Sequence, residues 1–207
     1  MQPAPGGAAD LRVAVERGFG ERADLATRYA DLLCTAGIER GLIGPREADR
    51  IWDRHLFNSV ALAPLIAPDA TVVDLGSGAG LPGIPVALAR PDLKVILVEP
   101  MARRVAFLRE CVDTLGLERV EIHYGRAPDD VPRGEVVVAR AVAALPSLAE
   151  LALTGPNRFA ELIALKGASV HKEVAEVRGE GRFEVEVVVV TDPAGASATV
   201  ARVRRAR

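Results

Sequence analysis

The sequence predicts an α/β protein in which a helical extension precedes an open, mostly parallel sheet of seven strands that ends in an antiparallel hairpin. From Thr71 onward, short runs of β-branched and aliphatic residues alternate with helical stretches, which is typical of parallel strands joined by right-handed crossovers. Runs such as VVVA at residues 136–139 are apolar at every position, as expected of strands buried on both faces. The last two runs are joined only by the turn-forming residues DPAGAS, which favours a hairpin.

The elements follow in order along the chain and together define a Rossmann-like fold class. We expect a flexible lead-in at residues 1–9, a helical extension at residues 10–67 and a sheet domain at residues 68–207. Pro45 suits the first position of a helix running to about Ala63, after a loop at residues 38–47, because the first turn does not use the donor that proline lacks. The predicted strands are residues 71–75, 94–98, 120–124, 135–139 and 161–165, with the hairpin at 183–191 and 198–204.

Length and composition fit one globular domain with a small extension. The chain has 207 residues, of which 49% are hydrophobic and 26% charged, unlike a disordered or fibrous protein. Its net charge of −2 means that local patches would have to attract a nucleic acid. Cys34 and Cys111 form no CxxC pair, which argues against a zinc site or a disulfide framework. No apolar run reaches the length of a membrane span and the N-terminus lacks signal-peptide features, so we expect a cytoplasmic protein without membrane or metal.

The most informative stretch is VVDLGSGAGLPGIP at residues 72–85. A predicted strand runs into Gly76, Gly78 and Gly80 at the edge of the sheet where open α/β folds bind ligands, and glycines let a ligand approach the backbone. A dinucleotide site would place its third glycine where this chain has Leu81. The G-x-G-x-G spacing, followed by two prolines that remove backbone donors, favours a nucleoside cofactor without a pyrophosphate.

Charged residues end further predicted strands on the same rim. Glu99 ends the second strand, 25 positions after Asp74, where a carboxylate can accept hydrogen bonds from ribose hydroxyls. Arg140 follows the fourth strand and Lys166 the fifth, and each is either functional or part of an ordinary salt bridge. Residues 125–130, after the third strand, are either a site for an adenine ring or an ordinary loop.

The glycine-rich segment resembles a known family. The string GLPGIP is similar to that of the bacterial 16S ribosomal RNA guanine-N7 methyltransferases, historically called glucose-inhibited division protein B. The resemblance extends from about Asp24 to the C-terminus, and its supporting segments are WDRHLFNS at residues 52–59, RVAFLRE at 104–110, ARA at 139–141 and ALKG at 164–167. It implies methyl transfer from S-adenosylmethionine to N7 of a guanine in 16S ribosomal RNA, within the small ribosomal subunit.

The resemblance also assigns residues to roles. Arg140 matches a family arginine at the mouth between cofactor and substrate and is the candidate catalytic residue. Pro128 departs from the family, which often has glutamate there, and residues 41–44 and Asn58 replace family motif residues, so the roles of those missing side chains are not transferred. The candidate cofactor-binding residues are Asp74, Gly76, Ser77, Gly78, Gly80, Leu81, Glu99, Arg126, Ala127, Pro128 and Arg140. The candidate RNA contacts are Arg54, His55 and Lys166, with Arg103, Arg104 and the tail arginines at residues 202–207 as weaker candidates.

The chemistry of guanine N7 indicates what such a site needs. N7 carries an in-plane lone pair and no proton at neutral pH, so attack on a sulfonium methyl needs no general base. Catalysis is then expected from alignment at about 3–3.5 Å. The base becomes cationic, so Arg140 is expected to hold a phosphate, guanine O6 or the cofactor carboxylate rather than to stabilise that charge. Because the RNA major groove is deep and narrow, a looped or single-stranded guanine is the expected target.

Three other functions stay open at this point. An NAD-linked oxidoreductase has a similar sheet but is disfavoured by Leu81 in place of the third glycine. A non-catalytic ribosome assembly or RNA-binding protein would keep the cofactor fold, and a methyltransferase acting on a small molecule is weakened only by the resemblance. We expect a monomer. Its affinity for naked RNA is expected to be weak, because the chain has few basic clusters.

Overall fold

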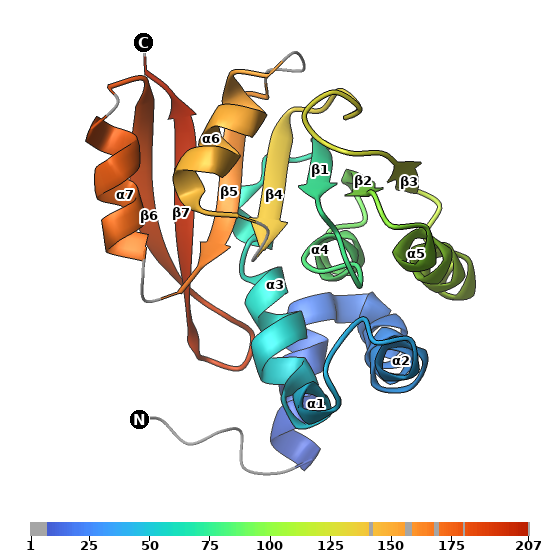
Figure 1. Ribbon diagram of the computed structural model, residues 1–207. Coiled ribbons are helices and arrows are strands. Elements are labelled where there is room, and N and C mark those ends of the chain that lie inside the picture. The colour runs from blue at the N-terminus through green and yellow to red at the C-terminus, as the bar shows by residue number, and fades with distance from the viewer. Residues whose placement is uncertain (1–7, 141–142, 156–158, 168–169, 180, 207) are drawn as a thin grey trace.

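Seven strands form a single sheet in the order β3-β2-β1-β4-β5-β7-β6, shown in Figure 1. The computed structural model describes residues 8–140, 143–155, 159–167, 170–179 and 181–206. Strands β1 to β5 pair in parallel, whereas β7 is antiparallel to both β5 and β6. The predicted mostly parallel sheet with an antiparallel hairpin is therefore confirmed. The predicted lead-in at residues 1–9 falls largely outside the described residues.

Each predicted strand lies within one residue of an observed strand. The strands are β1 (Thr71–Leu75), β2 (Lys94–Glu99), β3 (Val120–Tyr124), β4 (Val136–Arg140), β5 (Glu161–Lys166), β6 (Phe183–Thr191) and β7 (Ser197–Arg205). The apolar runs are buried because helices cover both faces. Helices α4 (Gly83–Ala89) and α5 (Ala102–Leu115) contribute to one hydrophobic cluster, and α6 (Leu145–Leu153) and α7 (Val170–Gly179) contribute to the other. Along β1, Val72 faces the first cluster and Val73 the second, which is the alternation of a pleated strand.

The connection from β3 to β4 corrects the expected alternation of strands and helices. Residues 125–135 form turns and coil instead of a helix. The connection has to pass β2 and β1, because these strands lie between β3 and β4 in the sheet. Ala127 and Val131 pack against the second cluster, and a Cβ on Gly134 would lie 2.7 Å from Val73 Cγ2. The loop itself therefore covers this part of the sheet, and its close approach to β1 requires the glycine at position 134.

The N-terminal extension is helical, as predicted. Its elements are α1 (Ala8–Phe19), a 3-10 turn (Gly20–Arg22), α2 (Ala23–Leu32), a π-helical turn (Leu33–Gly37), a continuous helical stretch comprising Pro45–Arg50, Ile51–Phe57 and α3 (Asn58–Val60), and a 3-10 turn (Ala63–Leu65). Pro45 begins the second helical stretch, which ends at Val60 rather than Ala63. The loop before it covers residues 40–44, shorter than predicted, because the first stretch continues through residue 39.

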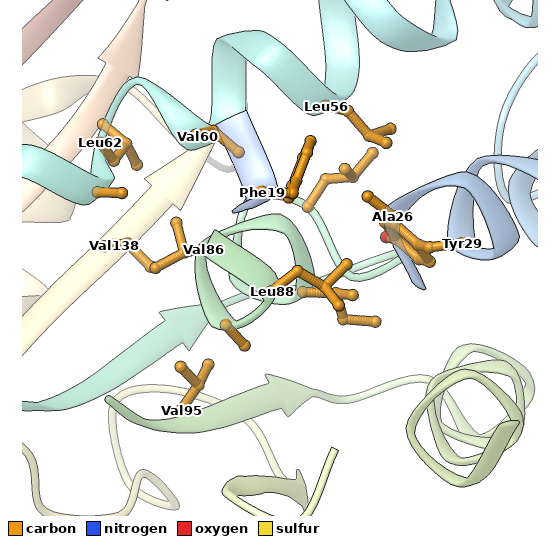
Figure 2. Packing of buried hydrophobic residues seen from close by; sticks show 14 of the residues in the cluster. Phe19, Ala26, Tyr29, Leu56, Val60, Leu62, Val86, Leu88, Val95 and Val138 are labelled. Carbon is orange, nitrogen blue, oxygen red and sulfur yellow. The ribbon is translucent and has the colours of Figure 1, made fainter. Parts of the chain in front are cut away.

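The extension and the sheet share one hydrophobic core. Tyr29, Leu56 and Phe57 are fully buried in the same cluster as Ile84 and Leu88 of α4. Figure 2 shows side chains of the extension, including Tyr29 and Leu56, gathered around α4. Burial of large apolar side chains stabilises a fold by about 1.5–3 kcal/mol each, so this contact holds the extension firmly on the sheet. The division of the chain at residue 67 stays a prediction.

The turn of the β6–β7 hairpin contacts the extension (Figure 1). The Arg17 guanidinium donates a hydrogen bond to the carbonyl oxygen of Pro193 over 3.1 Å. A Cβ on Gly18 would lie 2.9 Å from Pro193 Cγ, so the backbone of α1 lies directly against this turn. These contacts fix the hairpin turn against the N-terminal extension. In the described parts of the chain, no helix is both long enough and apolar enough to cross a membrane.

Candidate active site at the strand ends

The charged residues predicted at the strand ends lie on one rim of the sheet. Glu99, Arg140 and Lys166 are the last residues of β2, β4 and β5, and Asp74 is the penultimate residue of β1. The strands run in parallel and are hydrogen-bonded in the order β2-β1-β4-β5. Their carboxyl ends therefore meet at the same edge, as the sequence predicts.

The glycine loop leaves β1 in a conformation that needs glycine. Gly76, Gly78 and Gly80 have φ angles of 69°, 60° and 96°, in the left-handed region. The backbone N–H groups of Gly76 and Ser77 donate to the carbonyl oxygen of Val98 over 2.9 and 3.1 Å, which ties the loop to β2. The buried hydroxyl of Ser77 donates to a backbone carbonyl at the end of β1. Ser77 therefore stabilises the loop from within.

Glu99 binds the glycine loop directly. The side chain is buried, and Oε2 accepts a hydrogen bond from the N–H of Gly78 over 2.9 Å, while Oε1 accepts one from Met101 over 3.0 Å. The Arg104 guanidinium lies 3.6 Å from Oε2 of Glu99. This arginine, a candidate RNA contact, therefore forms an ion pair with the carboxylate at the end of β2. A carboxylate offers about four acceptor positions, which leaves capacity for a ribose hydroxyl.

Asp74 is a buried carboxylate with one unused oxygen. Its Oδ2 accepts a hydrogen bond from the N–H of Gly83 over 3.0 Å, whereas Oδ1 has no partner among the described residues. Burial raises the pKa of Asp74 to about 7, against the opposing effects of its hydrogen bonds and of Arg140. The group therefore titrates near neutral pH, which is unusual for an aspartate.

Tyr29 of α2 supports the glycine loop, a role that the sequence analysis missed. Its side chain is fully buried, and its hydroxyl donates to the carbonyl oxygen of Ala79 over 2.7 Å. Burial raises the pKa of Tyr29 well above its ordinary value. The contact joins positions 50 residues apart, and no local pattern in the helix distinguishes this tyrosine from an ordinary core residue. Only the packing of α2 on the sheet reveals it.

Replacing Tyr29 by phenylalanine is expected to destabilise the protein by about 1–3 kcal/mol, because the buried carbonyl of Ala79 loses its donor. The melting temperature measures this change, and cofactor titration should show weaker binding because the loop is less well held. Tyr124→Phe is the matched control, since Tyr124 is 58% exposed and should tolerate the change. Equal melting temperatures for the two variants would contradict the prediction.

Arg140 is held by two groups that carry no negative charge. Its Nη1 donates to the carbonyl oxygen of Arg54 over 3.1 Å, and its Nη2 donates to Nδ1 of His55 over 2.5 Å. Within the described ranges, no carboxylate forms a salt bridge with this guanidinium. Burial lowers the pKa of Arg140, although not enough to discharge an arginine. A partly buried cation without a counter-ion is suited to binding an anion.

A cavity of about 720 Å³ opens beside Arg140. The three predicted RNA contacts, Arg54, His55 and Lys166, all line it together with Arg140. Lys166 Nζ is 2.7 Å from Glu173 Oε2 and also donates to a backbone carbonyl, so its charge is largely neutralised. The other lining residues are Arg50, Asp53, Asn58, Ala143, Ala144, Leu165, Gly167, Glu173, Asp192, Ala196 and Ser197. The walls thus come from the extension, the strand ends, α7 and the hairpin.

The remaining candidate residues, Leu81 and residues 126–128, do not line this cavity. Leu81 is buried in the first hydrophobic cluster, below the glycine loop. Ala127 packs against the second cluster, and its neighbours Arg126 and Pro128 are exposed. Their contact with a cofactor stays a prediction. The candidates therefore fall into two groups. The loop side comprises the glycine loop with Asp74 and Glu99, and the cavity side comprises Arg140 and the other residues that line the cavity.

Comparison with known proteins gives consistent results. The pattern of the GidB family, described as rRNA small subunit methyltransferase G, matches residues 22–197. A protein of Kineococcus radiotolerans, named ribosomal RNA small subunit methyltransferase G, is 51% identical over 203 residues, which are 93% of this chain and 79% of that protein. A protein of the same name from Acidothermus cellulolyticus is 55% identical over 156 residues, 75% of this chain and 70% of that protein.

Solved structures resemble the fold. A SAM dependent methyltransferase from Aquifex aeolicus superposes with a TM-score of 0.54 at 18% identity, covering 78% of this chain and 98% of that chain. At this level of identity, the likeness concerns the fold alone. It agrees with the Rossmann-like class predicted from the sequence.

Proposed function

Because the chain belongs to the GidB family of rRNA small subunit methyltransferase G, we propose that it transfers a methyl group from S-adenosylmethionine to N7 of a guanine in 16S ribosomal RNA. The family match over residues 22–197 carries this proposal. The small ribosomal subunit is the proposed partner. The NAD-linked oxidoreductase and the non-catalytic assembly protein have no comparable support.

The loop side fits a cationic nucleoside cofactor. S-adenosylmethionine supplies a methyl group activated by a sulfonium, and with its ammonium and carboxylate groups it carries a net positive charge. Asp74 and Glu99 place two buried carboxylates beside the glycine loop, and Oδ1 of Asp74 lacks a partner among the described side chains and backbone groups. Negative charge beside the loop favours a cation. We assign Glu99 to the ribose hydroxyls and Asp74 to electrostatic attraction of the cationic end.

The cavity side fits a nucleotide. Its volume of about 720 Å³ is in the range of ordinary ligand pockets. Arg140 stands at its edge on β4, next to β1 and its glycine loop in the sheet. The guanidinium would hold a phosphate or guanine O6, so that N7 is aligned with the methyl group. No proton has to be removed from N7, and the proposal therefore assigns no residue as a general base.

The proposal is tested with methyl-labelled S-adenosylmethionine and small ribosomal subunits from cells that lack this protein. We expect label in 16S RNA, and mapping should place it on N7 of one guanine. Subunits from cells that contain the protein are the control and should take up little label. Label in protein or in another nucleobase, or none at all, would refute the proposal. Naked 16S RNA in a parallel reaction tests whether the folded subunit is needed, and we expect it to react poorly.

The titration of Asp74 predicts a pH-dependent stability. Its pKa is raised to about 7 in the folded protein, so folding takes up a proton between the ordinary pKa of an aspartate and about pH 7. The resulting stability is present in full below the ordinary pKa and is lost as pH rises to about 7. Between about pH 5.5 and about pH 8.5, wild type should therefore lose about 2 kcal/mol of unfolding free energy relative to Asp74→Asn. Denaturant titrations without cofactor at both pH values measure the difference. Parallel pH dependences in the two proteins would show that Asp74 does not titrate in this range.

A further inference from the structure

A chain of three side chains connects the extension to Arg140. The carboxylate of Glu47 is 2.7 Å from Nε2 of His55, and Nδ1 of the same imidazole is 2.5 Å from Nη2 of Arg140. The His55 side chain is only 7% exposed, so water cannot readily replace either partner. Arg140 and His55 are 85 residues apart in the sequence and meet at the edge of the cavity.

The partners of His55 determine where its proton lies. A guanidinium only donates hydrogen bonds, so Nδ1 has to accept and carries no hydrogen. Nε2 then carries the single proton and donates it to Glu47. The contact with Arg140 therefore requires a neutral imidazole. A second proton on Nδ1 would place two donors and two positive charges against each other.

From this geometry we propose that His55 is a positioning residue whose neutral imidazole holds Arg140 in place for methyl transfer, and whose protonation releases it. The inference rests on the proposed function, because it takes Arg140 as the residue that contacts the substrate. Without His55, the only other described hydrogen bond of the Arg140 guanidinium is the one to the carbonyl oxygen of Arg54. A single hydrogen bond leaves the planar guanidinium of Arg140 free to rotate. The nucleotide is then no longer aligned, although the positive charge remains.

The surroundings keep the imidazole neutral at physiological pH. Burial lowers the pKa of His55, and Arg140 and Arg54 act in the same direction, whereas Glu47 acts in the opposite direction. Elsewhere around the shared cavity, the described charged groups are Arg50 and Asp53 of the extension, Lys166 of β5, Glu173 of α7 and Asp192 of the hairpin. Protonation of His55 is therefore expected only at pH values below the ordinary range of a histidine.

Two substitutions separate the two hydrogen bonds of His55. In His55→Asn, the amide oxygen takes the place of Nδ1 and still accepts from Arg140, but the side chain does not titrate. In His55→Gln, the longer side chain brings its amide nitrogen to the place of Nε2, where it can donate to Glu47 but offers Arg140 no acceptor. His171→Asn is the control, because this exposed histidine of α7 does not line the cavity.

The measured quantity is kcat at saturating cofactor and small subunits, between about pH 5.5 and about pH 8. Wild type and His171→Asn should lose activity toward acid, while His55→Asn should keep most of the neutral rate and show no such loss. His55→Gln should be roughly tenfold slower at every pH, as expected for a lost hydrogen bond to a charged group. An unchanged acid loss in His55→Asn, or equal rates for the two variants, would overturn the inference.

A measurement on the wild-type protein makes the result independent of folding defects in the variants. Nitrogen NMR of the wild-type imidazoles should show His55 neutral at pH 7 with its proton on Nε2, and an imidazolium at that pH would overturn the inference.

The use of saturating cofactor separates the effect of His55 titration from that of Asp74 titration, because the latter is expected to affect cofactor affinity. If Arg140→Ala is fully active, the assignment of Arg140 in the proposed function fails. If Arg140→Ala is slow but His55→Gln is as fast as wild type, only the positioning role fails.

Discussion

Replacing Arg140 by alanine is expected to slow methyl transfer by about 100-fold at saturating cofactor and small subunits, the size of effect that follows from losing alignment of the reacting atoms. The guanidinium is partly buried at the edge of the cavity and has no carboxylate partner in the described structure. Removing it takes away the group that we expect to orient the nucleotide. It does not remove stabilisation of the positive charge that develops on guanine, because a guanidinium cation provides none. The effect should therefore appear in kcat more than in the KM for the cofactor.

The comparison for this variant is Arg12→Ala. Arg12 lies on α1 with a side chain that is 80% exposed, so its loss removes the same charge without touching the cavity. Thermal melting and cofactor titration should show that Arg140→Ala is folded and binds cofactor. Full activity of Arg140→Ala under saturating conditions would show that nucleotide alignment does not depend on this side chain.

Replacing Gly80 by alanine is expected to destabilise the protein by about 3 kcal/mol and to abolish measurable cofactor binding. The φ angle of Gly80 is 96°, and an added Cβ would lie 2.5 Å from Ile84 Cδ1 and 2.8 Å from the Tyr29 hydroxyl. Ile84 and Tyr29 are fully buried, so neither can move aside without disturbing the core. The loop would have to shift, and with it the backbone that contacts Glu99.

Gly116→Ala provides the control for backbone strain alone. Gly116 ends α5 with a φ angle of 61°, and no atom lies within 4 Å of an added Cβ. This variant should lose about 1 kcal/mol from the left-handed conformation and bind the cofactor normally. If Gly80→Ala were no less stable than Gly116→Ala, the tight packing around Gly80 would not matter for the loop.

The strand ends could be predicted from the sequence because the governing pattern is local. Apolar runs mark buried strands, and the carboxyl ends of parallel strands share an edge, so Glu99, Arg140 and Lys166 were correctly placed on one rim. The helix-free crossover after β3 was missed although residues 125–135 carry two prolines and two glycines. That composition disfavours a helix, and the alternation seen elsewhere in the chain was wrongly extended to it.

The contacts that complete the site could not be predicted in the same way. Tyr29 reaches Ala79 and His55 reaches Arg140 only because the extension packs on the sheet at one particular angle. Neither helix pattern specifies that angle, since many apolar faces pack with similar energy. The glycine loop and Glu99 could thus be predicted from the sequence, whereas the positions of Tyr29 and His55 could be identified only from the fold.

The part of the cavity wall that the hairpin supplies determines when the cavity can form during synthesis of the chain. The cavity is walled by residues near position 50 and also by Asp192, Ala196 and Ser197 of the hairpin. A nascent chain that still holds the hairpin inside the exit tunnel has its glycine loop outside but lacks this wall. The cavity is therefore complete only after the hairpin has left the tunnel and packed against the extension, so an unfinished copy lacks the full nucleotide site proposed above.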